Sequence, residues 1–126
     1  MGAVRPRTRG VGQFRVILRG EVYDVDLGQP VGHEPAHRRP AIVVSADIVS
    51  NSVGGLVAVV PITSRSYGLR SHVDLDSNES GLAHPSFARC DQLRFIAVER
   101  LHRRRGSASV SEVAGIDTAL RFVLDL

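Results

Sequence analysis

The stretch RRPAIVVSADIVSNSVGGLVAVVPITS, residues 38 to 64, contains the two apolar segments that decide the fold. Residues 41–44 are continuously apolar and mostly β-branched, which is typical of a strand in the middle of a sheet. Residues 56–62 predict a second buried strand, and the polar segment between the two predicts a short helical turn or a loop. The centre of the fold is therefore expected to be a sheet.

Further strands are predicted on both sides of this centre. Apolar and polar residues alternate over residues 21–27, which predicts a strand with one buried face, and they alternate again over residues 72–76. Residues 87–98 predict one long strand. Five or so short antiparallel strands of this kind indicate a small, curled β-barrel or sandwich.

The C-terminal segment has helical periodicity instead. Ser109 and Glu112 match a capping box, in which the hydroxyl and the carboxylate satisfy free amides at the start of a helix. Apolar residues then recur at helical spacing, which predicts one amphipathic helix over residues 110–124. The predicted fold class is mainly β with helices (α+β), and it ends in this helix.

Composition and charge restrict the class of protein. The chain has 126 residues, enough for one domain, and no apolar run approaches the ~20 residues of a membrane span. A single cysteine excludes an intrachain disulfide and favours a reducing cytosol. All sixteen basic residues other than histidine are arginines, five of them within residues 1–19. We expect a flexible Arg-rich arm over residues 1–18 and a folded domain over residues 19–126.

A second arginine cluster, residues 100–105, follows the last predicted strand. A basic run of this kind predicts a solvated, flexible surface, and guanidinium groups favour an anionic partner such as nucleic acid. Aromatic residues make up only 5% of the chain, so base stacking can contribute little to such binding.

One segment spells a metalloprotease signature. His33-Glu34-Pro35-Ala36-His37 matches H-E-x-x-H, which works only when both histidines lie on one face of a helix. Pro35 would stand inside that helix, and the surrounding prolines and glycine predict a loop. We therefore expect no metal site here, and no cofactor.

Charged residues interrupt the predicted strand over residues 87–98. With a period of two, Arg89 and Asp91 share one face, and Cys90 and Gln92 share the other. The charged pair is either a structural ion pair on a solvated face or a functional pair. Cys90 is expected in the core.

Five segments, taken in order, carry a resemblance to a known family. They are Arg19-Gly20-Glu21-Val22-Tyr23, Gly32-His33-Glu34, Arg38-Arg39-Pro40-Ala41-Ile42-Val43-Val44, Val60-Pro61-Ile62-Thr63-Ser64 and Arg89-Cys90-Asp91-Gln92-Leu93-Arg94. With these segments the chain resembles the MazF/PemK-type toxin family over about residues 19 to 124.

The resemblance implies a fold and an activity. It implies a small SH3-like antiparallel β-barrel that acts as a cytoplasmic homodimer and is inhibited by a cognate acidic antitoxin. The implied activity is that of a metal-independent, sequence-specific endoribonuclease acting on single-stranded RNA (mRNA, rRNA or tRNA). Attack by the 2′-hydroxyl would leave a 2′,3′-cyclic phosphate and a 5′-hydroxyl.

The resemblance also points to site residues, with two alternatives for the chemistry. In one, Arg39 and Thr63 form the catalytic pair; in the PemK-like branch, Asp91 is the base, Arg89 the acid, and His33 assists. Because an arginine with a pKa above ~12 donates protons poorly, we assign both arginines to charge stabilisation and leave proton transfer to His33 or Asp91. The predicted substrate contacts are Ser64, Gln92, Arg65, Tyr67 and Arg70.

The alternative function is a non-catalytic poison. A related family with the same barrel binds a protein target, DNA gyrase, and the fold alone does not separate the two. The set of Arg39, Thr63, Arg89 and Asp91 favours the enzyme, since a pure binder has no reason to keep these four residues together.

Overall fold

The computed structural model describes residues 16–29, 31–33 and 37–126. The first four arginines of the predicted arm lie outside the described residues, as do Glu34, Pro35 and Ala36 of the H-E-x-x-H segment. No helix in the described part of the chain is long and apolar enough to cross a membrane.

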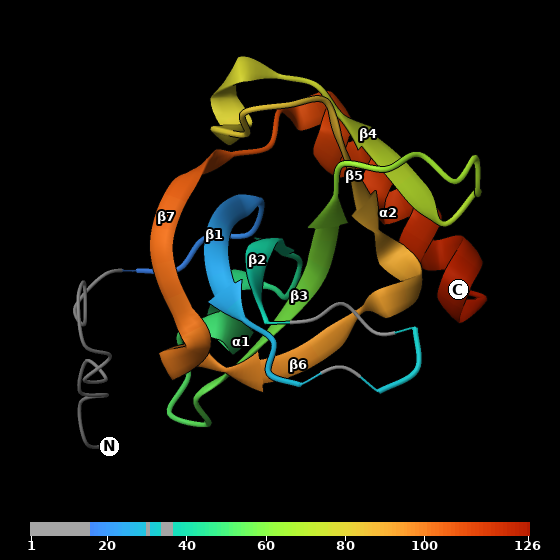
Figure 1. Cartoon of the computed structure of the whole chain (residues 1–126). Coiled ribbons are helices and arrows are strands. Elements are labelled where there is room, and N and C mark those ends of the chain that lie inside the picture. The colour runs from blue at the N-terminus through green and yellow to red at the C-terminus, as the bar shows by residue number, and fades with distance from the viewer. Residues whose placement is uncertain (1–15, 30, 34–36) are drawn as a thin grey trace.

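Antiparallel strands form one strongly curled sheet, with a long helix packed against its outside (Figure 1). The strand order is β4-β5-β3-β2-β1-β7, and β6 pairs with β3 off this path. Among the described strands no ladder joins β4 to β7, so the barrel is not closed by hydrogen bonds. The strands are β1 (Glu21–Asp26), β2 (Arg38–Val43), β3 (Leu56–Thr63), β4 (His72–Leu75), β5 (Ser86–Arg89), β6 (Arg94–Ala97) and β7 (Leu101–Ser107).

The helices complete this mainly β architecture and agree with the predicted class. The long helix is α2 (Val110–Leu124), whose bounds match the prediction, and a short helix, α1 (Asp47–Ser50), joins β2 to β3. Three single turns of 3₁₀-helix lie at corners of the chain: η1 (Asn78–Ser80), η2 (Cys90–Gln92) and η3 (Val98–Arg100).

The curled sheet has a core on each face. Tyr23 and Val25 of β1 pack in the cluster inside the curl, while Val22 packs in the cluster under α2, with Ile116 and Ala119. The prediction of a single buried face for this strand was therefore wrong at Val22. The cause is tertiary, because the helix covers the outer face of the sheet.

The predicted long strand over residues 87–98 is also wrong, because the structure divides it into β5, η2 and β6. β5 pairs with the end of β3, at Ile62 and Thr63, and β6 pairs with the first half of the same strand. The chain must turn to reach both partners, and η2 makes this corner. Cys90 is buried at the corner, as expected.

The arginine cluster after β6 is a strand and not a flexible surface. β7 pairs with β1, and its guanidinium groups meet acidic residues of that strand. Arg104 Nε lies 2.7 Å from Glu21 Oε2, and Arg105 Nη1 lies 3.2 Å from Asp24 Oδ1. The prediction failed because an arginine-rich sequence gives no strand signal, although long arginine stems can pack while their heads reach solvent.

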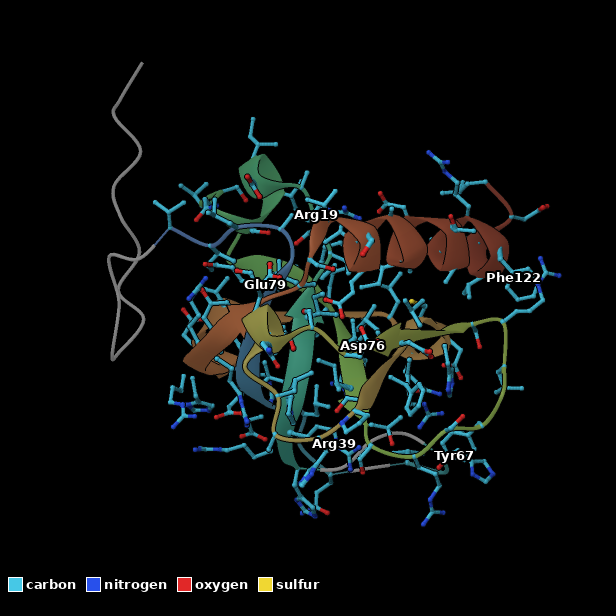
Figure 2. All side chains as sticks on the ribbon, turned by 90° about the horizontal axis from the view of Figure 1, so that it is seen from above. Arg19, Arg39, Tyr67, Asp76, Glu79 and Phe122 are labelled. Atoms are coloured by element: carbon cyan, nitrogen blue, oxygen red, sulfur yellow. The ribbon has the colours of Figure 1, made fainter. Side chains whose placement is uncertain are left out.

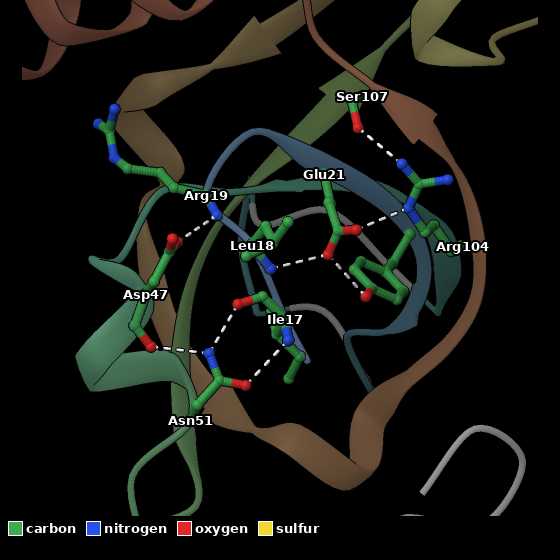
Figure 3. A network of polar contacts seen from close by, with 9 residues as sticks. Ile17, Leu18, Arg19, Glu21, Asp47, Asn51, Arg104 and Ser107 are labelled. Atoms are coloured by element: carbon green, nitrogen blue, oxygen red, sulfur yellow. Dashed lines mark hydrogen bonds and ion pairs between the residues drawn. The ribbon is translucent and has the colours of Figure 1, made fainter. Parts of the chain in front are cut away.

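The folded part begins earlier than the predicted domain boundary. Ile17 is buried in the inner core, and its backbone is held by the Asn51 side chain, which accepts from Ile17 N at 2.8 Å and donates to Ile17 O at 2.7 Å (Figure 3). Leu18 N donates to Glu21 Oε1, and Arg19 N donates to Asp47 Oδ1. These bonds fix residues 17–19 against α1 and β1.

The capping box at the start of α2 is present as predicted, and its glutamate does more than cap. The Glu112 carboxylate accepts from Ser109 N at 2.8 Å, and also from Asp76 N at 2.8 Å, Ser77 N at 3.0 Å and Ser77 Oγ at 2.6 Å. Burial works to raise the pKa of this carboxyl, but the hydrogen bonds outweigh it, so the pKa lies below its ordinary value. The helix start is thereby tied to the end of β4.

Candidate functional site

A pocket of about 660 Å³ lies at the edge of the sheet where β2 begins and β3 ends. It collects side chains from the ends of strands and from the connections between them. Those that the sequence predicted are His33, Arg39, Thr63, Ser64, Arg65, Tyr67 and Arg89, and the lining also includes His84, Ser86 and Arg105.

Strand pairing explains why these segments meet. β2 and β3 are antiparallel, with Ala41 opposite Pro61, so the start of one strand lies beside the end of the other. Continuing this register by two residues places Arg39 opposite Thr63. β5 pairs with the last residues of β3 on its other side, which brings Arg89 to the same edge.

Arg89 is held on the pocket wall by a cluster of three other side chains. Its Nη2 lies 3.5 Å from Asp91 Oδ2, and the other carboxylate oxygen, Oδ1, lies 3.1 Å from His72 Nε2. Tyr67 contacts both basic residues, with its ring edge-to-face against His72 and 5.7 Å from the Arg89 guanidinium. These contacts hold the guanidinium at the pocket wall through Nη2, while its buried Nε has no hydrogen-bond partner among the described residues.

Asp91 is therefore placed differently from its predicted role. It is absent from the described residues that line the pocket, and both of its oxygens face basic side chains. The corner η2, rather than a strand period of two, brings it against Arg89. This geometry suits a residue that positions Arg89.

Two predicted substrate contacts also lie away from the pocket. The Arg70 guanidinium stacks 4.1 Å from the centre of the Phe122 ring on α2, far along the molecule from Arg39 (Figure 2). Gln92 is half-buried in η2. Neither is among the described residues that line the pocket.

Sequence reasoning missed four polar residues of this region, namely His72, His84, Ser86 and Arg105. His72 begins β4, where alternation indicated only a strand, yet its side chain is 3% exposed and contacts Asp91. His84 lies in the connection before β5, which carries no motif. Arg105 belonged to the cluster interpreted as a solvated surface. The run of polar residues around Arg105 carries no alternation, so no sequence signal singled it out.

The H-E-x-x-H segment does not have the geometry of a zincin. His37 has a φ of 55°, in the left-handed region, and its backbone pairs with Leu27 and Gly28. A residue in this conformation cannot belong to the α-helix that the motif requires. His33 lines the pocket and His37 does not, and no cluster of metal-binding side chains occurs among the described residues.

The electrostatics of the pocket favour an anion. Four guanidinium groups line it, from Arg39, Arg65, Arg89 and Arg105, together with two imidazoles, and its described lining contains no carboxylate. Guanidinium groups bind phosphate oxygens in a bidentate manner, and imidazoles transfer protons near neutral pH. The pocket can therefore bind a phosphate group and move a proton beside it.

The buried thiol near this site is unsuited to nucleophilic chemistry. Burial, and then the charge of Asp91, raise the pKa of Cys90 to about 12. A thiol with such a pKa is almost entirely protonated at neutral pH. Cys90 thus belongs to the core beneath the site.

Comparison with known proteins adds the family context. The PemK-like, MazF-like toxins of type II toxin-antitoxin systems match residues 18–124 of the chain. The endoribonuclease MazF9 of Mycobacterium tuberculosis is 40% identical over 116 residues, covering 88% of this chain and 98% of the relative.

Solved structures agree with this match. The crystal structure of MazF from Deinococcus radiodurans has a TM-score of 0.75 at 25% identity and covers 88% of this chain and 98% of that one. A MazE-MazF structure from the same organism has a TM-score of 0.70 at 26% identity, covering 88% and 97% of the two chains.

Proposed function

Because the chain belongs to the PemK-like, MazF-like toxins of type II toxin-antitoxin systems, we propose that it is a metal-independent endoribonuclease that cuts single-stranded RNA at a short sequence. The observation that carries this proposal is the convergence of Arg39, Thr63 and Arg89 from three strands on one pocket, beside the imidazole of His33.

The proposed reaction is an internal attack on the phosphate. The 2′-oxygen bonds to phosphorus, the bond from phosphorus to the 5′-oxygen breaks, and the products are a 2′,3′-cyclic phosphate and a 5′-hydroxyl. One proton leaves the 2′-hydroxyl and another reaches the 5′-oxygen. Arg39 and Arg89 stabilise the charge that develops on the phosphate, and the Thr63 hydroxyl orients one of its oxygens.

The geometry supports one of the two candidates for proton transfer. His33 lines the pocket, whereas Asp91 lies behind Arg89 with both oxygens facing His72 and Arg89. We assign proton transfer to His33 and a positioning role to Asp91. Ser64, Arg65 and Tyr67 would contact the RNA from the pocket wall, while contacts from Gln92 and Arg70 stay predictions.

The role of His33 is tested by the dependence of the cleavage rate on pH. His33→Ala is expected to remove one limb of the wild-type profile, because the group that titrates in that limb is gone. His102→Ala, on β7 and outside the pocket lining, should retain both limbs and serves as the control. Two intact limbs in His33→Ala would rule out His33 as the proton carrier.

The partners follow from the same proposal. We expect a homodimer in the cytoplasm, where RNA is available, and a cognate antitoxin whose acidic, partly disordered segment covers the basic pocket. Such a segment competes with RNA for the same guanidinium groups.

The decisive test of the function is a cleavage assay with a long RNA in EDTA. Purified protein is expected to produce discrete cuts that bear 5′-hydroxyl ends, which a 5′-kinase labels without prior phosphatase treatment. Absence of cutting by a protein that still arrests growth would favour the non-catalytic poison that binds a target such as DNA gyrase.

A further inference from the structure

A second pocket, of about 240 Å³, adjoins the phosphate pocket and shares Leu82, Ala83 and His84 with it. We propose that this second pocket binds one base of the RNA next to the cut, and that it selects a base that carries an amino group. The proposal rests on the proposed function, since it assigns to the same substrate a site that the sequence did not indicate.

The two pockets differ in charge, and this difference identifies what each binds. Four guanidinium groups line the larger pocket, whereas the described lining of the smaller one contains no arginine and includes the carboxylate of Asp76. A phosphate in the smaller pocket would be repelled by that carboxylate. A neutral, flat group with hydrogen-bond donors is favoured, and a nucleobase adjoining a bound phosphate has these properties.

The lining supplies both parts of base recognition. Leu82 and Pro85 offer apolar surface to the faces of a ring. Asp76 and Asn78 offer polar groups to its edge. A carboxylate accepts hydrogen bonds from amino groups such as the N4 amine of cytosine or the N6 amine of adenine, and uracil has no amino group. Uracil offers only its N3–H as a donor on this edge, between two carbonyl oxygens that the carboxylate repels, so the site should discriminate against uracil.

The backbone around Asp76 is fixed before RNA binds. Asp76 N and Ser77 N both donate to the buried Glu112 carboxylate. Gly81, which follows η1, lies so close to β7 that a Cβ added to it would stand 2.1 Å from the carbonyl oxygen of Arg105. The turn that contains Glu79 therefore packs its backbone directly against the backbone of β7 (Figure 2). A rigid site loses little freedom on binding, which favours selectivity.

The test is the sequence preference of cleavage in a pool of RNAs randomised around the cut. Asp76→Asn is expected to relax the preference at one position, where uracil becomes acceptable, and to slow cleavage of the best sequence by about 10-fold. Asn78→Ala should weaken the preference at the same position. Asp74→Asn is the matched control, since Asp74 is exposed on β4 and lines neither pocket.

The outcomes separate this inference from the function itself. Both variants should first show unchanged thermal unfolding. If Asp76→Asn and Asn78→Ala then keep the wild-type base preference at every position, or slow the cleavage of all sequences equally, the proposed base site is wrong. The proposed endoribonuclease activity is unaffected by that result. If wild-type protein cuts no RNA, the proposed function fails first.

Discussion

Replacing Arg39 by alanine is expected to lower the rate of RNA cleavage by about 10²–10³-fold. The Arg39 side chain lines the phosphate pocket from the start of β2, together with Thr63 and Arg89. A fixed guanidinium stabilises the charge that develops on the phosphate more than it stabilises the bound RNA, so its loss should appear in the chemical step. Single-turnover cleavage with excess enzyme measures that step directly.

The control for this prediction is another arginine of the same protein. Arg103 on β7 is 75% exposed at its side chain and lies outside the pocket lining, so Arg103→Ala removes the same charge without removing the contact. The cleavage rate of Arg103→Ala should stay within about three-fold of the wild-type rate. If both variants slow cleavage equally, the effect is one of net charge, and the assignment of Arg39 to the phosphate fails.

The largest effect on stability is expected at Glu112, where Glu112→Gln should lower the free energy of unfolding by about 3 kcal/mol. The carboxylate accepts from the backbone of Ser109, Asp76 and Ser77 and from the Ser77 hydroxyl. A glutamine has one oxygen for these donors, and its amide nitrogen brings a further donor against them. Urea unfolding measures the change.

The dependence of stability on pH gives an independent check on Glu112. Its pKa is lower in the folded protein than in the unfolded chain, so its contribution is fully present above the unfolded pKa and is lost as the pH falls through the folded pKa. The difference between wild type and Glu112→Gln should therefore shrink in acid. The control is Glu99→Gln, since Glu99 is exposed. If the difference in unfolding free energy between wild type and Glu112→Gln stays constant at all pH values, the lowered pKa of Glu112 is contradicted.

The parts of the fold that local sequence encodes were predicted well. The bounds of α2 follow from its cap and its apolar spacing, and β3 follows from its continuous apolar run. The failures occurred where partners far along the chain decide the structure. The corner η2 exists because β5 and β6 pair with different parts of β3. β7 forms because its backbone pairs with β1, whose acidic residues also meet its arginines.

For the site, the sequence by itself determined which side chains stand at strand ends: Arg39 before Pro40, and Thr63 after an apolar run. Only the tertiary structure decided which of them share a pocket, that His72 and Asp91 support Arg89 from behind, and that His84 and Arg105 join the lining. The physical reason is the range of the forces involved. Caps and apolar periodicity act within a few residues, whereas the curl of a sheet and the pairing of its charges depend on residues that meet only after the chain has folded.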